Sequence, residues 1–252
     1  MSDRAAAPVR ISQTLDRGLQ VLEAVARSGD PLSVAQAAQI AGIDRTIAHR
    51  LVATLALRGY LHRESSGGYR LGPTCLALAS AITDLRTMAR PFLEALSRAT
   101  RETVHVVVLS GREAVFIDGI ESSHTLRVAS RVGRLVPAHA TSVGKAWLAC
   151  LSEGRIDELY GSSDLAAVTS RTICDRQQLA AELQATRDRG YAVSRGESEA
   201  GVGSVAVAVC SPSGEPRAAL SVAVPLERWS DDFEGNAVEH LRRAASALGA
   251  SL

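Results

Sequence analysis

The stretch whose residue types could do chemistry is "PAHATSVGKAWLA", residues 137–149, which holds a histidine, two hydroxyl residues and the only lysine of the chain. Ser142 precedes Lys145 by three residues, which is the Ser-x-x-Lys spacing of serine acyl-enzymes. Gly144 followed by Lys145 is a pair that also occurs in phosphate-binding loops. The stretch therefore has three interpretations: an acylated serine, a phosphate site, or the start of a helix.

Both catalytic interpretations lack required residues. A phosphate-binding loop needs Gly-x-x-x-x-Gly-Lys-Ser/Thr, but His139 stands at its first glycine and Ala146 at its hydroxyl position. The penicillin-recognising acyl-enzymes also need a Lys-Thr-Gly element, which this sequence does not contain. We therefore expect no catalytic residue, and keep an enzyme acting on a small molecule through the second half of the chain as the alternative.

Cofactor and metal motifs are equally incomplete. The segment "GVGSVA", residues 201–206, fits Gly-x-Gly-x-x-Ala, but it opens a strand pattern where a dinucleotide site needs a helix. His105 and His139 have no sequence-near partner for a metal pair, and we expect both to be structural. The four cysteines are far apart and form no Cys-x-x-Cys. We expect neither a cofactor nor a bound metal.

The remaining interpretation of residues 137–149 is a helix start. Thr141 or Ser142 can cap a helix that continues through "VGKAWLACL". Free amides and the positive end of the helix dipole favour an anion there, and small residues allow a ligand to approach closely. This predicts a site that binds a small molecule without attacking it.

The elements that must position such a site follow from the pattern around it. The segment 103–121 has two β-rich runs split by Ser-Gly-Arg, which indicates a hairpin. We expect a further strand in "TLRVASRVG", two more in residues 201–225, and helices between and after them. The segment 73–102 predicts a helix interrupted near Pro91, followed by a second helix. Strands with hairpin turns between helices predict an α+β fold with a mainly antiparallel sheet flanked by helices.

The first seventy residues have a different pattern. Residues 12–29 predict an amphipathic helix whose core face is formed by Leu15, Leu19, Leu22, Val25 and Ala26. A second, short helix opens with a capping box, Ser33 with Gln36. Gly42 ends it, and Asp44 is the expected N-cap of a third helix. Two helices joined by a short turn with glycine indicate a helix-turn-helix.

The third helix has one polar and one apolar face over its first two turns. The apolar face holds Ile47, Ala48, Leu51 and Leu55. The polar face is cationic and would meet base edges in the major groove of DNA. Its members are Arg45, Thr46, His49 and Arg50.

The segment after this helix reads as strand, tight turn, strand, which completes a winged helix. Arg63 and Arg70 lie on the wing and are expected to contact the DNA backbone. Residues 1–72 carry nine arginines against six acidic residues, whereas the rest of the chain carries 19 basic and 21 acidic residues. A basic N-terminal segment and a mildly acidic remainder suggest two domains with different functions.

The segments "LDRGLQVLEAVA", "LSVAQAAQIAGIDRTIAHRLVATLALRGYL" and "RVGRLVPAHATSVGKAWLA" resemble the IclR-type bacterial transcriptional regulators over roughly residues 12–245. Asp44-Arg45 departs from many members, which leaves the operator sequence open. The resemblance implies a winged helix-turn-helix domain over residues 1–73, a linker helix over 74–90 that helps to form a dimer, and a GAF-like effector-binding and oligomerisation domain over 91–252.

The resemblance also implies an effector site against the helix start at Ser142, the neighbouring strands and the segment after "RGY". Carried over motif by motif, its residues are Val128, Ser142, Val143, Ser194, Val202, Ser204, Ser221 and Ala223. Ser194 stands where several relatives with small acid effectors have an acidic residue, and Ala223 replaces a hydroxyl residue of some relatives. These losses favour an aromatic or aliphatic acid over a two-carbon acid.

The function expected from the sequence is a cytoplasmic transcription factor that binds a DNA operator as a homodimer or homotetramer and responds to a small-molecule effector. No apolar run approaches the roughly 18 residues of a membrane span, and the start of the chain lacks the apolar core of a signal peptide. A helix-turn-helix used only for protein contacts is a further alternative, which salt-dependent DNA binding would exclude.

Overall fold

The computed structural model describes residues 11–80, 83–161 and 164–252. The chain divides into two compact units, residues 1–83 and 84–252. The expected linker helix over 74–90 spans the boundary between them, and its residues 81–82 lie outside the described part of the chain.

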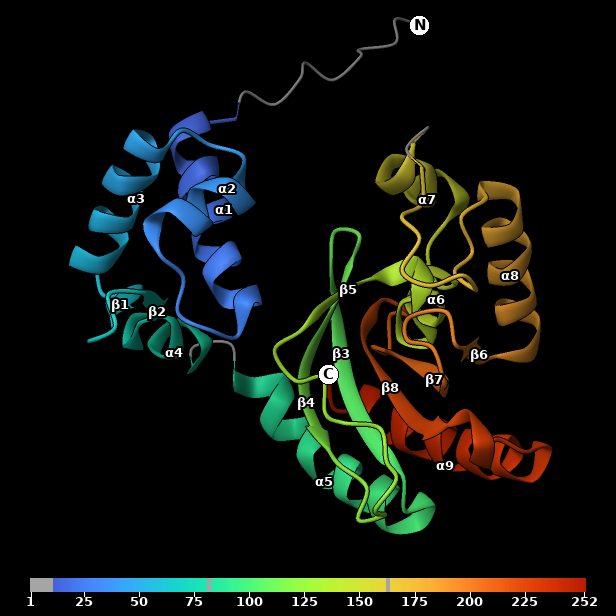
Figure 1. The fold of residues 1–252 in the computed structure, drawn as a ribbon. Helices are drawn as coiled ribbons and strands as arrows, with labels where there is room; N and C mark the ends of the chain where they lie inside the picture. Colours follow the sequence, from blue (N-terminus) through green and yellow to red (C-terminus); the bar gives the residue numbers. More distant parts are fainter. Residues whose placement is uncertain (1–10, 81–82, 162–163) are drawn as a thin grey trace, which may run out of the picture. The chain divides into compact units, whose positions relative to one another are not determined.

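The first unit is the predicted winged helix (Figure 1). Its elements are α1 (Gln13–Ser28), α2 (Val34–Ala41), α3 (Arg45–Leu57), the antiparallel pair β1 (Leu61–Arg63) and β2 (Tyr69–Leu71), and α4 (Pro73–Ser80). The capping box of α2 forms as expected, because Ser33 accepts from the Gln36 amide and Gln36 accepts from the Ser33 amide. Gly42 ends α2 in the left-handed conformation, with φ of 63°.

The core face of α1 differs from the predicted one. Val21 and Val25 are buried together with Gly18 and Ala24, whereas Leu15 and Leu19 are 63% and 48% exposed. The prediction is confirmed for Val25 and for Leu22, which packs against this core, but it was wrong for Leu15, Leu19 and Ala26. Gly18 faces Leu51 of α3, and a Cβ at this position would lie 3.7 Å from the Leu51 Cδ2. Leu15 and Leu19 therefore form an apolar stripe on the outside of the helix.

The second unit is built on a six-stranded antiparallel sheet with the order β5-β4-β3-β8-β7-β6. Its strands are β3 (Thr103–Ser110), β4 (Glu113–Ile120), β5 (Leu135–Pro137), β6 (Ala192–Arg195), β7 (Val202–Cys210) and β8 (Pro216–Pro225). The helices are α5 (Thr83–Thr100), α6 (Ser142–Leu148), α7 (Glu153–Tyr160), α8 (Arg176–Arg189) and α9 (Asp231–Gly249). This is the predicted α+β fold.

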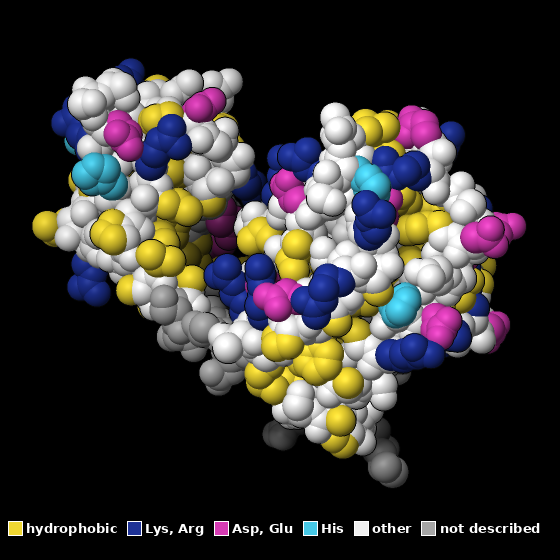
Figure 2. All heavy atoms as spheres, turned by 90° about the horizontal axis from the view of Figure 1, so that it is seen from below, with side chains coloured by type: hydrophobic (Ala, Val, Ile, Leu, Met, Phe, Trp, Pro, Cys, Tyr) yellow, Lys and Arg dark blue, Asp and Glu magenta, His cyan; other side chains and the backbone are white. Residues whose placement is uncertain are grey.

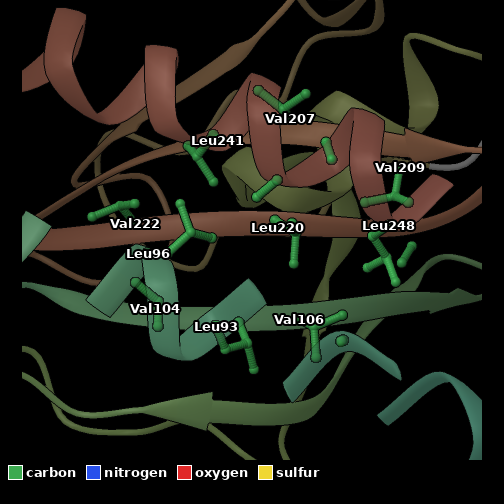
Figure 3. Close-up of a cluster of buried hydrophobic side chains, with 14 of the residues drawn as sticks. Leu93, Leu96, Val104, Val106, Val207, Val209, Leu220, Val222, Leu241 and Leu248 are labelled. Atoms are coloured by element: carbon green, nitrogen blue, oxygen red, sulfur yellow. The ribbon is translucent and has the colours of Figure 1, made fainter. Parts of the chain in front are cut away.

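The two faces of the sheet are packed differently. On one face, α5 and α9 cover large branched side chains such as Val106, Val207 and Leu220, and Leu93 and Leu241 fill the space between them (Figure 3). On the other face, α6 packs against β6, β7 and β8 over mostly small residues, among them Ala192, Ala206 and Ala219.

Two expectations for this unit were wrong. Pro91 lies inside α5 and does not interrupt it. The exposed position of Pro91 leaves room for the carbonyl that loses its hydrogen bond to meet water. Residues 125–133 form no strand either. The Glu121 carboxylate accepts from the Ser130 amide and the Arg127 side chain, which folds this segment as a loop.

Candidate functional site

The start of α3 presents the predicted polar face to solvent. Asp44 caps the helix, because its Oδ1 accepts from the Thr46 amide at 2.7 Å and the Ile47 amide at 3.4 Å. These hydrogen bonds hold the pKa of Asp44 below its usual value. Ala48 and Val52 are buried beneath the helix. The four residues predicted to read bases are all exposed: Arg45, Thr46, His49 and Arg50.

Ile47 is not part of the core as predicted but is 37% exposed. It borders a hollow of about 320 Å³ between α1 and α3, with Thr14, Arg17 and Arg50 around it. The isoleucine therefore adds an apolar contact to the cationic face.

The two wing arginines differ in their surroundings. Arg63 is exposed at the end of β1. Arg70 donates to the carbonyl of Gly29 at 2.9 Å and lies 3.6 Å from the Glu64 carboxylate. Arg70 thus fastens the wing to the end of α1, whereas Arg63 is simply exposed.

The space-filling view shows Lys and Arg side chains interspersed with Asp and Glu on the face drawn (Figure 2). This mixture agrees with the net charge of +1. The positions of individual arginines are therefore a better guide to a DNA-binding surface than the total charge is.

The predicted effector residues of the second unit lie on neighbouring rungs of the sheet. In β6, β7 and β8, Ser194 pairs with Ser204, which pairs with Ala223. Two residues along, Ser221 of β8 pairs with His105 of β3. Directly opposed residues of an antiparallel pair share a face, so all of these side chains are on the side that α6 covers.

A cavity lies between these rungs and α6. Seven of the eight residues predicted for the effector site line it, while Ser194 lies on the same rung as Ser204 but does not line the cavity. The seven are Val128, Ser142, Val143, Val202, Ser204, Ser221 and Ala223. The volume is about 20 Å³, room for roughly one water molecule. Ser142 and Ser204 meet across it, with their hydroxyl oxygens 2.8 Å apart.

Five further residues line the cavity that sequence reasoning did not assign to the effector site: His105, Phe116, Arg131, Thr141 and Ser198. They come from β3, β4 and three loops, so no local motif connects them. Only His105 could have been found from the sequence. The alternation along its strand places the imidazole on the same face of the sheet as Ser221 of β8.

Two loops meet over the cavity through Arg131, whose side chain is only 10% exposed. Its guanidinium donates to the Glu199 carboxylate at 2.6 Å and to the Ser198 hydroxyl at 3.0 Å. It also lies over the Phe116 ring, 5.9 Å from the centroid. The loop 121–134 is thereby joined to the loop 196–201.

His105 forms the floor beneath Arg131. Its Nε2 accepts from the Arg131 backbone amide at 3.2 Å, which places the proton of the neutral ring on Nδ1. Burial, with a smaller contribution from the Arg131 charge, lowers the pKa of His105 to about 4. The imidazole packs edge-on to Phe116, and a side chain at Gly119 would clash with it. His105 is therefore neutral near pH 7 and adds no charge to the cavity.

The stretch that suggested catalysis is a capped helix start. Thr141 is the N-cap, since its hydroxyl accepts from the Gly144 amide at 3.0 Å. A Cβ at Gly144 would lie 2.1 Å from the carbonyl oxygen of Ala138, which explains the glycine without a phosphate. Lys145 binds Glu197 at 2.7 Å and Glu182 at 3.4 Å, whereas Ser142 bonds Ser204. The serine and the lysine have different partners.

The other residues considered for chemistry have structural surroundings. His139 is buried, bonds the Ala166 carbonyl at 3.0 Å and packs edge-on to Tyr160. Gly203 lies within β7, not at a helix start. Within the described ranges, no cluster of His, Cys, Asp and Glu could hold a metal ion. None of the described helices is long and apolar enough to cross a membrane.

A winged helix-turn-helix with an exposed cationic face on α3 is the form of a DNA-binding domain. Residues 14–65 match the IclR helix-turn-helix domain, and residues 77–250 match the family described as bacterial transcriptional regulator IclR C-terminal. The chain belongs to the IclR family of bacterial transcriptional regulators. The resemblance inferred from the sequence is thus confirmed.

Individual relatives agree. The HTH-type transcriptional regulator XynR of Escherichia coli K12 is 34% identical over 246 residues, covering 96% of this chain and 98% of XynR. The transcriptional repressor IclR of the same strain is 32% identical, covering 87% of this chain and 82% of the repressor. These proteins are regulators rather than enzymes.

A solved structure extends the likeness to the whole fold. It is an IclR homologue from Microbacterium hydrocarbonoxydans complexed with 4-hydroxybenzoate. It is 28% identical, with a TM-score of 0.76, and the match covers 94% of this chain and 98% of that one.

Proposed function

We propose that this regulator binds a DNA operator as a homodimer or homotetramer and that an organic acid held in the cavity changes this binding. The observation that carries the proposal is the convergence of seven residues, chosen by sequence motif, on one cavity beside a buried arginine. The IclR homologue complexed with 4-hydroxybenzoate supports the choice of an acid.

In this proposal α3 reads the operator and the wing positions it. Arg45 and Arg50 can donate two hydrogen bonds to guanine, and Thr46 and His49 can reach bases or phosphates. Arg63, which is exposed at the end of β1, contacts the backbone. Arg70 contributes to the backbone contact partly by holding the wing in place, since its Nη1 donates to the Gly29 carbonyl.

Assembly of two or four copies is supported by the apolar side chains exposed in the first unit. Leu15 and Leu19 on α1 and Leu78 on α4 are between 48% and 63% exposed. Burial of such side chains against a second copy would stabilise an assembly, since each stabilises by about 1.5–3 kcal/mol when fully buried.

The lining of the cavity favours an effector with one acidic and one apolar end. Val128, Val143, Val202 and Ala223 supply apolar contacts. Four serine hydroxyls and the Arg131 guanidinium supply donors for a carboxylate. This composition suits an aromatic or aliphatic acid better than a two-carbon acid. Such a ligand changes DNA binding only if it has unequal affinity for the two arrangements of the protein.

The test uses the full chain. Duplexes that bind it are selected from a random pool at physiological salt, and gel shifts then measure their affinity with and without benzoate, 4-hydroxybenzoate, hexanoate and the neutral benzamide. We expect sequence-specific, salt-dependent binding that at least one acid changes several-fold. Selection of no consensus would overturn the DNA proposal, and a response to benzamide alone would overturn the acid effector.

A further inference from the structure

Arg131 is the one cationic side chain among the described residues that line the cavity, because the others are apolar, hydroxyl-bearing or a neutral imidazole. A guanidinium that is only 10% exposed needs an anionic partner, since an unpaired buried charge is strongly destabilising. In the structure that partner is Glu199, at 2.6 Å.

The two members of this ion pair are not equally tied to the protein. The side chain of Glu199 is 54% exposed and can turn to water with little loss of solvation. Arg131 cannot follow, because its amide is bonded to His105 and its guanidinium lies against Phe116. If the pair separates, the arginine stays at the cavity and the glutamate leaves.

A cavity of about 20 Å³ cannot admit an organic acid unless the contacts over it open. The Arg131–Glu199 ion pair and the Arg131–Ser198 hydrogen bond are such contacts. A neutral ligand that broke them would leave Arg131 without an anion. A ligand with a carboxylate can replace Glu199 directly and keep the arginine paired.

We propose that Glu199 occupies the place of the effector's carboxylate, so that binding exchanges one carboxylate for another on Arg131 and releases the segment 198–201. This inference rests on the proposed acid effector. It adds that Glu199, by competing for Arg131, makes the site select ligands with a carboxylate. No covalent bond is made or broken in the exchange, and Arg131 has a carboxylate partner both before and after it.

The neighbouring contacts limit how far the released segment moves. Glu197 is held by Lys145, and its carbonyl accepts from the Thr172 hydroxyl at 2.7 Å. The Gly196 carbonyl accepts from the Thr169 hydroxyl at 2.7 Å. At the other end, the Gly201 carbonyl accepts from the Leu226 amide at 2.8 Å. The movement is therefore confined to the few residues between 197 and 201.

Calorimetry on the full chain tests the exchange, with benzoate, 4-hydroxybenzoate and hexanoate as probes and benzamide as the neutral match. Glu199→Gln removes the competing charge, so we expect at least one carboxylate to bind roughly tenfold tighter or more, with no gain for benzamide. Arg131→Gln should lose the carboxylates, and Arg131→Lys should retain part of the affinity. Glu215 lies just before β8 and forms an exposed ion pair with Arg217. Glu215→Gln is therefore the matched control, and it should leave the affinity for the carboxylates unchanged.

The outcomes separate the two proposals. If the unchanged protein binds a carboxylate and Glu199→Gln binds it equally or more weakly, the exchange is wrong and the acid effector stands. If neither protein binds any of the three acids, both ideas are wrong. Glu199→Gln is a half-exposed substitution, and a thermal unfolding curve matching the unchanged protein shows that its folding is intact.

Discussion

Lys145 donates to both carboxylate oxygens of Glu197, with Nζ at 2.7 Å from Oε1 and 2.8 Å from Oε2. The lysine is 1% exposed and the glutamate 13%. Burial raises the pKa of the Glu197 carboxyl, while the ammonium acts in the opposite direction. Because Lys145 belongs to α6 and Glu197 follows β6, this pair joins the wall of the cavity to the segment that covers it.

Removing one member of this pair should destabilise the second unit. We expect Lys145→Met or Glu197→Gln to lower the free energy of unfolding by about 3–5 kcal/mol, because each leaves the other group buried without its full partner. Urea unfolding followed by tryptophan fluorescence measures this, since Trp147 and Trp229 both lie in the second unit. The exposed pair Arg243–Glu239 is the control, and Arg243→Ala should cost at most about 1 kcal/mol. A loss of that small size at Lys145 would contradict the prediction.

Replacing the arginines of α3 should weaken specific DNA binding. We expect Arg45→Ala to cost roughly 1–3 kcal/mol on a selected operator and to relax the preference at one base position, if it pairs with guanine. Arg50→Ala should also weaken binding. Gel shifts on the selected duplex and on single-base variants measure both effects. Unchanged affinity in both variants would remove α3 as the reading helix, and Arg243→Ala supplies a control far along the chain.

The two wing arginines should differ in what their loss affects. Arg63→Ala should weaken binding to all sequences alike and reduce the salt dependence by about one phosphate contact. Arg70→Ala should in addition lower thermal stability, because it loses the hydrogen bond to the Gly29 carbonyl. Salt titrations and melting curves of both variants separate the effects. A loss for Arg63→Ala that is confined to the operator would mean that this arginine reads sequence.

His105 should make the second unit sensitive to acid. Its pKa is about 4 in the folded protein, below the usual 6.5, so the unfolded chain binds the extra proton between these values. The contribution of neutral His105 to the free energy of unfolding is therefore fully present above pH 6.5. It decreases as the pH falls towards 4. At about 1.4 kcal/mol per pKa unit, the loss is roughly 3 kcal/mol at most. His105→Gln should show a flatter pH profile in urea unfolding, whereas His62→Gln, at an exposed position, should keep the original slope.

Cys150 should react slowly with alkylating reagents although its residue is exposed. Burial of its thiol, together with the neighbouring Cys210 at 3.9 Å, raises the pKa of Cys150 to about 12, and the thiolate is the reactive form. We expect iodoacetamide at pH 8 to modify the exposed Cys174 well before Cys150, as read by peptide mass spectrometry. Modification of both at the same rate would show that Cys150 is not shielded.

Local features were the ones that the sequence could predict. The Ser33–Gln36 capping box, the Asp44 cap and the Gly42 turn each depend on a few adjacent residues, and each forms as expected. The hairpins of the second unit followed from alternation and turn residues. The motif resemblance then placed seven residues around one cavity, although no local rule connects them.

What escaped prediction depends on contacts between distant segments. Leu15 was assigned to the core by periodicity alone, but it is exposed, and Gly18 faces Leu51 of α3. Arg131 lies in a quoted motif but was given no role at the site, because its partners Ser198 and Glu199 are more than sixty residues away. Only the register of the sheet and the folding of two loops bring such groups together.

Under the proposed exchange, the small volume of the cavity would set the timing of the response to an acid. A ligand must wait for the covering segment to open, so its association rate should rise with concentration and then level off at the opening rate. The apparent dissociation constant also exceeds the intrinsic one by the reciprocal of the fraction of open molecules. A substitution that favours the open form would therefore sensitise the regulator to every acid it binds, without touching the ligand.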